Sequence, residues 1–145
     1  MPAVRVYGEP VPKGSLSGYS RGGRVVMVEK VKDKGKWREK VRAAGAALLA
    51  TLDGPYTGPV IVHSTVTLAR PKSVTLAKRP YPCVKPDSDK LIRMILDALT
   101  DSGLITDDAL VIDERCVKTY PDSPGILDRL DRPGAVIRIE AMTWT

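Results

Sequence analysis

Aspartates are concentrated between residues 85 and 118, in the segment KPDSDKLIRMILDALTDSGLITDDALVIDERCVK. Asp87 and Asp89 stand two residues apart just before a predicted helix, and in an extended chain such residues point the same way. Two carboxylates on one side can bind a hard divalent cation. Asp107 and Asp108 open the next predicted strand. A third carboxylate from there would complete an oxygen-rich site if the helix and the strand are adjacent.

The same aspartates have purely structural interpretations. Asp89 or Ser88 is a suitable residue for the N-cap of the helix, and acidic side chains near a helix N-terminus interact favourably with its dipole. Asp107 and Asp108 are also typical of a turn. A D-x-D pair alone occurs in many metal enzymes, including nucleotide-sugar transferases, so residue types leave these alternatives open.

One face of the predicted helix is polar. Asp89, Arg93 and Asp97 recur at a spacing of four residues, which places them on the same side of a helix. Arg93 can contact a phosphate bound to the metal, or it can pair with Asp97 as a structural partner.

The charge of the chain is uneven along its length. Its 145 residues carry a net charge of +6, but residues 1–86 hold 16 basic and 5 acidic residues, whereas residues 87–145 hold 7 and 12. A basic half favours a polyanion partner, because Lys and Arg displace the counterions of phosphates. Acidic groups repel phosphate unless a cation lies between them, so the acidic half again points to a metal.

Length and composition exclude several classes of protein. With 145 residues, of which 43% are hydrophobic, the chain suits one domain with a packed core over 1–145. No apolar run approaches the roughly 20 residues of a membrane helix, and no secretory signal is evident, so we expect a cytoplasmic protein that does not bind membranes. His63, Cys83 and Cys116 are too few for an all-Cys/His zinc site, and both cysteines are expected to be reduced.

Hydrophobic periodicity predicts an α+β (mixed α/β) fold, a single small domain in which two main helices pack on a mixed β-sheet. We expect His63 to be a packed or surface residue of a strand, and Gly103 to cap the second helix. The strand at 24–29 is expected to pair with the first strand, and the strand at 109–118 to be buried. The predicted strands are 3–7, 24–29, 60–69, 109–118 and 135–141, the helices are 33–52 and 89–102, and the loops are 8–23, 70–86 and 121–134.

Four motifs taken together resemble the signature of the RusA family of Holliday-junction resolvases. They are K-P-D-x-D at 85–89, L-D-A-L-T at 96–100, D-D-A-x-V at 107–111 and G-x-P-x-P-K-G at 8–14. Each motif is weak by itself, but their kind and order agree with the family from about residue 3 to residue 140.

The resemblance implies a Mg²⁺-dependent endonuclease, with Mn²⁺ as a substitute, that acts as a homodimer on four-way DNA junctions in recombination and repair. The family's essential carboxylates correspond to Asp87, Asp89 and Asp108, and its essential basic residue corresponds to Arg93, where Lys is usual. Lys90 stands where Asn is common. The resemblance also implies a bacterial or phage source.

The implied mechanism is hydrolysis of a phosphodiester by a metal-bound water. Asp87, Asp89 and Asp108 would hold the metal, and Arg93 would steady the phosphate. A non-catalytic junction-binding protein is the main alternative, and a D-x-D transferase a weaker one, since the chain has no P-loop or G-x-G-x-x-G. The residues expected to contact DNA are Lys13, Lys72, Lys85, Lys90, Arg93 and Lys118, with Arg21, Lys78 and Arg79 as further candidates.

Overall fold

The computed structural model describes residues 1–14, 16–21, 24–29 and 34–143. The α+β class expected from the sequence is confirmed, with two helices and a mixed sheet. The elements are β1 (Ala3–Tyr7), β2 (Leu16–Arg21), β3 (Arg24–Glu29), α1 (Lys34–Leu49), β4 (Val60–Thr67), α2 (Ser88–Asp101), a 3₁₀ turn η1 (Asp108–Leu110), β5 (Val111–Thr119) and β6 (Gly134–Ala141).

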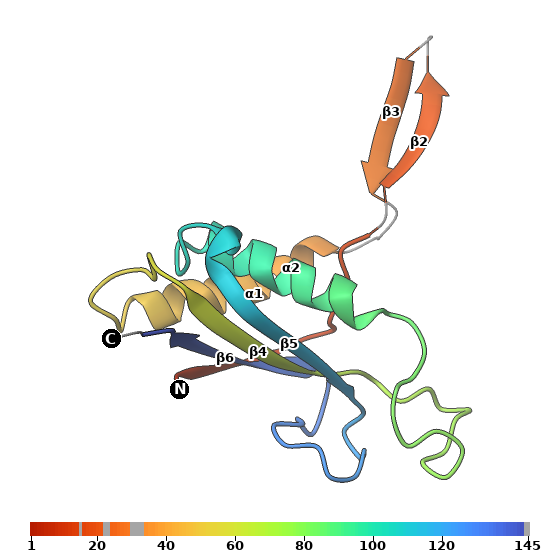
Figure 1. Cartoon of the computed structure of the whole chain (residues 1–145). Coiled ribbons are helices and arrows are strands. Elements are labelled where there is room, and N and C mark those ends of the chain that lie inside the picture. Colours follow the sequence, from red (N-terminus) through yellow and green to blue (C-terminus); the bar gives the residue numbers. More distant parts are fainter. Residues whose placement is uncertain (15, 22–23, 30–33, 144–145) are drawn as a thin grey trace.

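The molecule has two layers. Four strands form a sheet in the order β1-β6-β4-β5, in which β4 and β5 are parallel and the other pairs are antiparallel. Both helices lie over one face of this sheet (Figure 1). Because α2 connects the parallel strands β4 and β5, it runs back along the sheet from the end of β4 to the start of β5.

The core lies between the helices and the sheet. On α1, Trp37 and Val41 are buried, as the spacing of apolar residues predicts. The apolar side of α2 is buried over its whole length, from Leu91 to Leu99. Gly103 follows α2 with a positive φ of 82°, which confirms it as the residue after the helix C-cap. No helix of the described residues is long and apolar enough to cross a membrane.

The N-terminal part of the sheet was predicted wrongly. Residues 16–21, expected within a loop, form β2, which pairs with β3 so that Arg21 lies opposite Arg24. The strand β3 therefore does not pair with β1, whose partner is β6. The β2–β3 hairpin stands apart from the two layers (Figure 1). Its Gly- and Ser-rich composition resembles a loop, although Gly22-Gly23 between two strand-like segments is itself a hairpin signal. The predicted helix start at residue 33 lies outside the described residues.

The strand β5 is exposed, which contradicts the expectation of a buried strand. It lies at the edge of the sheet, and the side chains from Ile112 to Arg115 are exposed. The other strands and α2 lie within two residues of their predicted bounds. His63 is a half-buried strand residue, as expected, and its Nε2 lies 3.2 Å from Asp113 Oδ1 on the neighbouring strand.

Close packing of the two helices gives a test of the fold. A Cβ at Gly45 of α1 would lie 2.6 Å from Ser102 Oγ, a hydroxyl that already bonds to Leu99 O and Leu104 N. We expect Gly45→Ala to lower the free energy of unfolding by about 1–3 kcal/mol, as overpacking does.

The matched control is Gly35→Ala in the same helix, where a Cβ has no neighbour within 4 Å. This substitution should leave the free energy of unfolding unchanged or raise it by up to about 1 kcal/mol. Urea denaturation of both variants measures the difference, and equal effects would contradict the close approach of α1 to α2 at Gly45.

Candidate active site

Two of the three predicted metal ligands lie at the start of α2. Asp87 occupies the N-cap position, but its side chain accepts no capping hydrogen bond. Asp89 is the second residue of the helix, so the expectation that both acids lie in extended chain holds only for Asp87. Both carboxylates are exposed, and neither makes a hydrogen bond or ion pair within the described part of the chain. The expected N-cap at Ser88 or Asp89 is therefore wrong, because these are the first two residues of α2 and Asp87 holds the N-cap position.

The neighbouring acids at the start of η1 differ in role. Asp107 is the N-cap of η1, and its Oδ1 accepts a hydrogen bond of 2.8 Å from Ala109 N. The turn interpretation is thus confirmed for Asp107. Asp108 is exposed, and its carboxylate has no partner among the residues described. It remains available as a ligand.

The structure does not bring the three acids together within one chain. Asp87 and Asp89 lie at the N-terminal end of α2, whereas Asp108 follows its C-terminal end. The helix has 14 residues, which at 1.5 Å per residue corresponds to a helix length of about 21 Å. In the described ranges, no three His, Cys, Asp or Glu residues form a group that could hold a metal ion. The condition that the sequence set, that Asp108 lie beside Asp87 and Asp89, is therefore not met within one chain, because α2 runs from Asp87 towards η1.

Arg93 and Asp97 lie on the polar side of α2, as predicted, but they do not pair. Asp97 Oδ2 binds Lys13 Nζ at 2.7 Å. The backbone N–H of Lys13 also donates to Lys90 O at 3.0 Å, so the segment around residue 13 lies along α2. Arg93 is exposed and makes no ion pair within the part of the chain that the structure describes. Its guanidinium is therefore free to contact a phosphate near Asp89.

Arg70 makes several of the contacts that hold the basic segment 70–86 in place. The Arg70 guanidinium lies 4.1 Å from the centre of the Tyr120 ring and bonds to the Asp122 carboxylate at 2.8 Å. It also donates to the carbonyl oxygens of residues 75, 79 and 80. Hydrogen bonding from Arg70 lowers the pKa of the Asp122 carboxyl, so this contact persists at neutral pH. Sequence reasoning missed Arg70, because its contacts with Tyr120 and Asp122 lie some 50 residues away.

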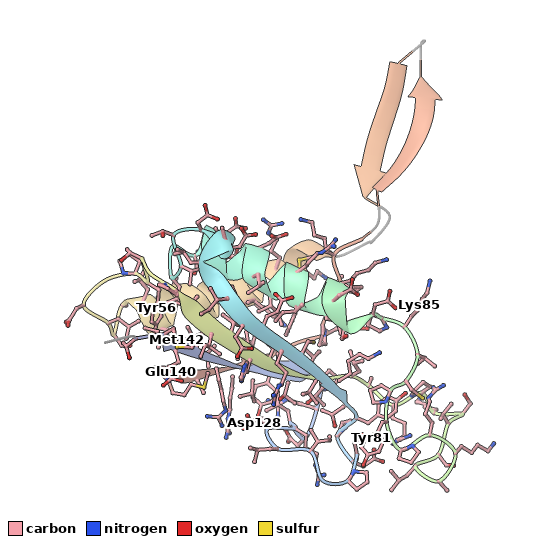
Figure 2. The ribbon with its side chains drawn as sticks, viewed as in Figure 1. Tyr56, Tyr81, Lys85, Asp128, Glu140 and Met142 are labelled. Atoms are coloured by element: carbon pink, nitrogen blue, oxygen red, sulfur yellow. The ribbon has the colours of Figure 1, made fainter. Side chains whose placement is uncertain are left out.

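The lysines predicted to bind DNA fall into different environments. Lys72 and Lys85 are exposed, and Lys85 extends outward just before α2 (Figure 2). Lys118 instead donates from Nζ to Val84 O at 2.8 Å and Pro86 O at 3.0 Å. Its ammonium thus fixes the chain immediately before Asp87. Lys13 differs again, since its ammonium is bonded to Asp97.

The two cysteines are free thiols. Burial raises the pKa of the Cys116 thiol to about 12, so at neutral pH it is not a thiolate nucleophile. The free thiols agree with the expectation of reduced cysteines.

Comparison with known proteins identifies the family of this chain. The family described as Endodeoxyribonuclease RusA matches residues 7–127, which include the segment around Lys13, the acids at both ends of α2, and Arg93. The chain belongs to the RusA endodeoxyribonuclease family. The resemblance carried by the four motifs is thereby confirmed.

The RusA match includes both β2–β3 and the segment 70–86, so these parts belong to the family domain. The chain is also similar to a protein of Bacillus subtilis (strain 168) named YqaN and described as uncharacterized. The two are 33% identical over 133 residues, which cover 83% of this chain and 89% of that protein.

The hydrogen bonds of Lys118 predict that this residue stabilises the chain just before α2. Lys118→Met removes two charge-assisted hydrogen bonds and leaves the carbonyls of Val84 and Pro86 without this donor. We expect a loss of about 1.5–3 kcal/mol in the free energy of unfolding, together with faster amide hydrogen exchange at residues 83–90. Lys72→Met is the control, because Lys72 is exposed and should change neither quantity. Equal behaviour of the two variants would mean that Lys118 does not anchor this segment.

Proposed function

We propose that this protein is a Mg²⁺-dependent endonuclease that resolves four-way DNA junctions by paired nicks and acts as a homodimer. Family membership supports cleavage of DNA. The proposal goes beyond DNA cleavage in naming the junction substrate, the metal and the dimer, and these three points rest on the geometry of the acids around α2.

The main support for the proposal is that the carboxylates of Asp87, Asp89 and Asp108 have no partner among the described residues. Three exposed carboxylates without internal partners are costly to place near a polyanion unless a cation neutralises them. Carboxylate oxygens suit Mg²⁺, which also keeps several waters. When bound, the metal supplies an acidified water and stabilises charge on the scissile phosphate. Arg93, one turn after Asp89, orients the phosphate and stabilises its developing charge.

A second copy of the chain completes the site. If two copies meet with their α2 helices antiparallel, Asp108 of one copy lies beside Asp87 and Asp89 of the other. The symmetry of the pair then creates two identical sites about one helix length apart. A four-way junction has approximate two-fold symmetry, so two such sites suit two symmetric cuts.

The apolar stripes of the helices are not available for the dimer contact, because they are buried in the core. The β5 edge is available, since β5 has one neighbour in the sheet and Ile112 is 59% exposed. Ile112 lies four residues after Asp108. An interface along the start of β5 would therefore carry Asp108 towards the second copy.

The remaining cations divide into two groups. Lys72 and Lys85 are exposed, with Lys85 two residues before Asp87, and both are suited to neutralise the phosphates of the DNA arms. Lys13 and Lys118 hold the chain around the acids through Asp97 and the carbonyls before Asp87, so their contribution to DNA binding is mainly indirect.

Cleavage of a synthetic four-way junction tests the proposal. With Mg²⁺, we expect paired nicks in opposing strands and little cutting of linear duplex, and EDTA should abolish both nicks. Asp87→Asn should lower the cleavage rate at least about a thousandfold. It should leave folding and junction binding intact, because the carboxylate has no internal partner.

Junction binding without cleavage by the wild-type protein, in Mg²⁺ and Mn²⁺, would instead identify a non-catalytic junction-binding protein. Cleavage unchanged in Asp87→Asn would show that this carboxylate is not a ligand.

The dimer contact is tested separately. Ile112→Asp places a charge at the proposed interface without disturbing the core, because Ile112 is exposed. We expect the variant to sediment as a folded monomer with the wild-type circular dichroism spectrum and to lose cleavage. Leu127→Asp, at an exposed apolar residue outside β5, is the control and should remain dimeric. A dimeric and active Ile112→Asp protein would place the interface elsewhere.

A further inference from the structure

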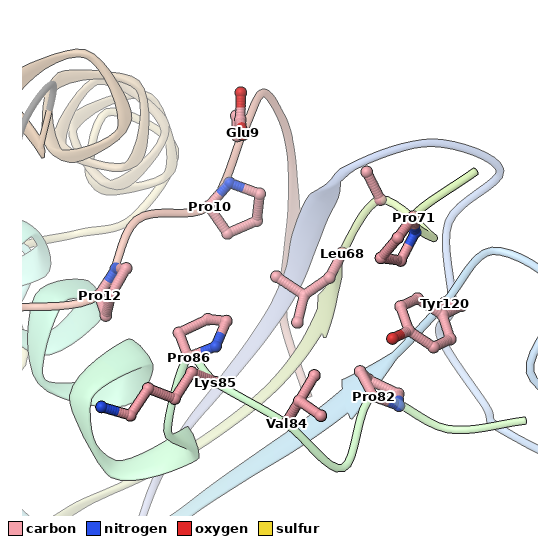
Figure 3. Close-up of a pocket in the computed structure, with 11 residues that line it drawn as sticks. Glu9, Pro10, Pro12, Leu68, Pro71, Pro82, Val84, Lys85, Pro86 and Tyr120 are labelled. Atoms are coloured by element: carbon pink, nitrogen blue, oxygen red, sulfur yellow. The ribbon is translucent and has the colours of Figure 1, made fainter. Parts of the chain in front are cut away.

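A pocket of about 270 Å³ opens between the N-terminal segment, the end of β4 and the residues just before α2. Its lining is mostly apolar (Figure 3). The lining residues that form its apolar walls include Pro12, Pro71, Pro82, Val84, Pro86 and Tyr120. Pro86 directly precedes Asp87, so the pocket adjoins the proposed position of the scissile phosphate.

The walls of the pocket are held firmly. Tyr120 is 2% exposed, with the Arg70 guanidinium over its ring and Arg79 Nε donating to its hydroxyl. Lys118 binds the carbonyls of Val84 and Pro86 in the wall before α2. A pocket whose walls are fixed by contacts outside it is preorganised for a ligand, since little conformational entropy remains to be lost.

The chemistry of the lining selects the kind of ligand. Proline rings and Val84 offer flat apolar surfaces, and Glu9 in the lining disfavours an anion such as a phosphate. The volume is below the roughly 300–1,000 Å³ of pockets for drug-sized ligands, so it suits one planar ring system and not a base pair. Lys85 in the lining and exposed Lys72 nearby favour a ligand attached to a polyanion.

We propose that this pocket receives one unpaired nucleobase, from the nucleotide next to the scissile phosphate. At a branch point bases are already partly unstacked, so removing one from the helix costs less there than in linear duplex. Packing of the base against the proline walls then holds the phosphate at Asp87. This inference rests on the proposed function. It predicts that the cleavage rate depends on a base that contacts no catalytic residue.

The first test needs no variant of the protein. A junction in which the nucleotide on either side of the cut is replaced in turn by an abasic residue should be cleaved by the wild-type protein about tenfold more slowly at one of the two positions. Abasic residues placed five nucleotides away in the same arms should have no effect. Equal rates on all these junctions would overturn the inference while leaving the proposed function intact.

The second test fills the pocket. Val84 is 43% exposed and contributes only its backbone carbonyl to the contact with Lys118, so Val84→Phe should fold. We expect it to cleave the intact junction about tenfold more slowly and to be insensitive to the abasic substitution that slows the wild-type protein. Leu76→Phe, equally exposed in the same segment but outside the pocket, should behave as wild type.

If the abasic residue slows Val84→Phe as much as it slows the wild-type protein, the base binds elsewhere. If the wild-type protein cleaves no junction at all, the proposed function fails and this inference fails with it. Cleavage that ignores both the abasic residue and Val84→Phe defeats the inference alone.

Discussion

The burial of α2 is the constraint on which the rest of the structure depends. Its apolar side, from Leu91 to Leu99, packs against the sheet and α1 so completely that the helix can neither shift nor rotate without opening the core. Asp87 and Asp89 are therefore held at one end, and Asp108 beyond the other end, of a helix about 21 Å long. Under the proposed function, a site that needs both groups of acids is therefore built from two chains. The core of each protomer then sets how the proposed dimer must assemble.

The basic side chains around the start of α2 have two different roles. Arg70 and Lys118 direct their charges inward, to a ring, a carboxylate and main-chain carbonyls, and so hold the basic segment in position. Lys85 and Arg93 direct theirs outward. Cations that look equivalent in the sequence thus divide into those that shape the segment and those free to meet phosphate. The net positive charge by itself does not make this distinction, because it counts both groups alike.

Local patterns in the sequence predicted what depends on local physics. The stripe of Leu and Ile residues predicted α2, Gly103 its end, and alternating β-branched residues the strand β4. The motifs correctly indicated the family. Features that depend on distant partners were missed or predicted wrongly. The pairing of β1 with β6 joins the two ends of the chain, and the partner of Arg70 lies 52 residues away. The exposure of β5 follows from its place at the sheet edge, which its apolar beginning does not reveal. The spacing of the acids indicated metal chemistry, but not that a helix length separates them.

Mixing two inactive variants tests the composite site most directly. In a mixed dimer of Asp87→Asn and Asp108→Asn, a composite arrangement gathers both substitutions into one site and leaves the other intact. Subunit exchange should then restore about a quarter of the wild-type nicking, in one strand per junction. Mixtures of Asp87→Asn with Asp89→Asn should stay inactive, since each site then lacks one acid. If the first mixture also stays inactive after exchange of subunits is verified, each chain holds its own complete site, and the composite site is contradicted.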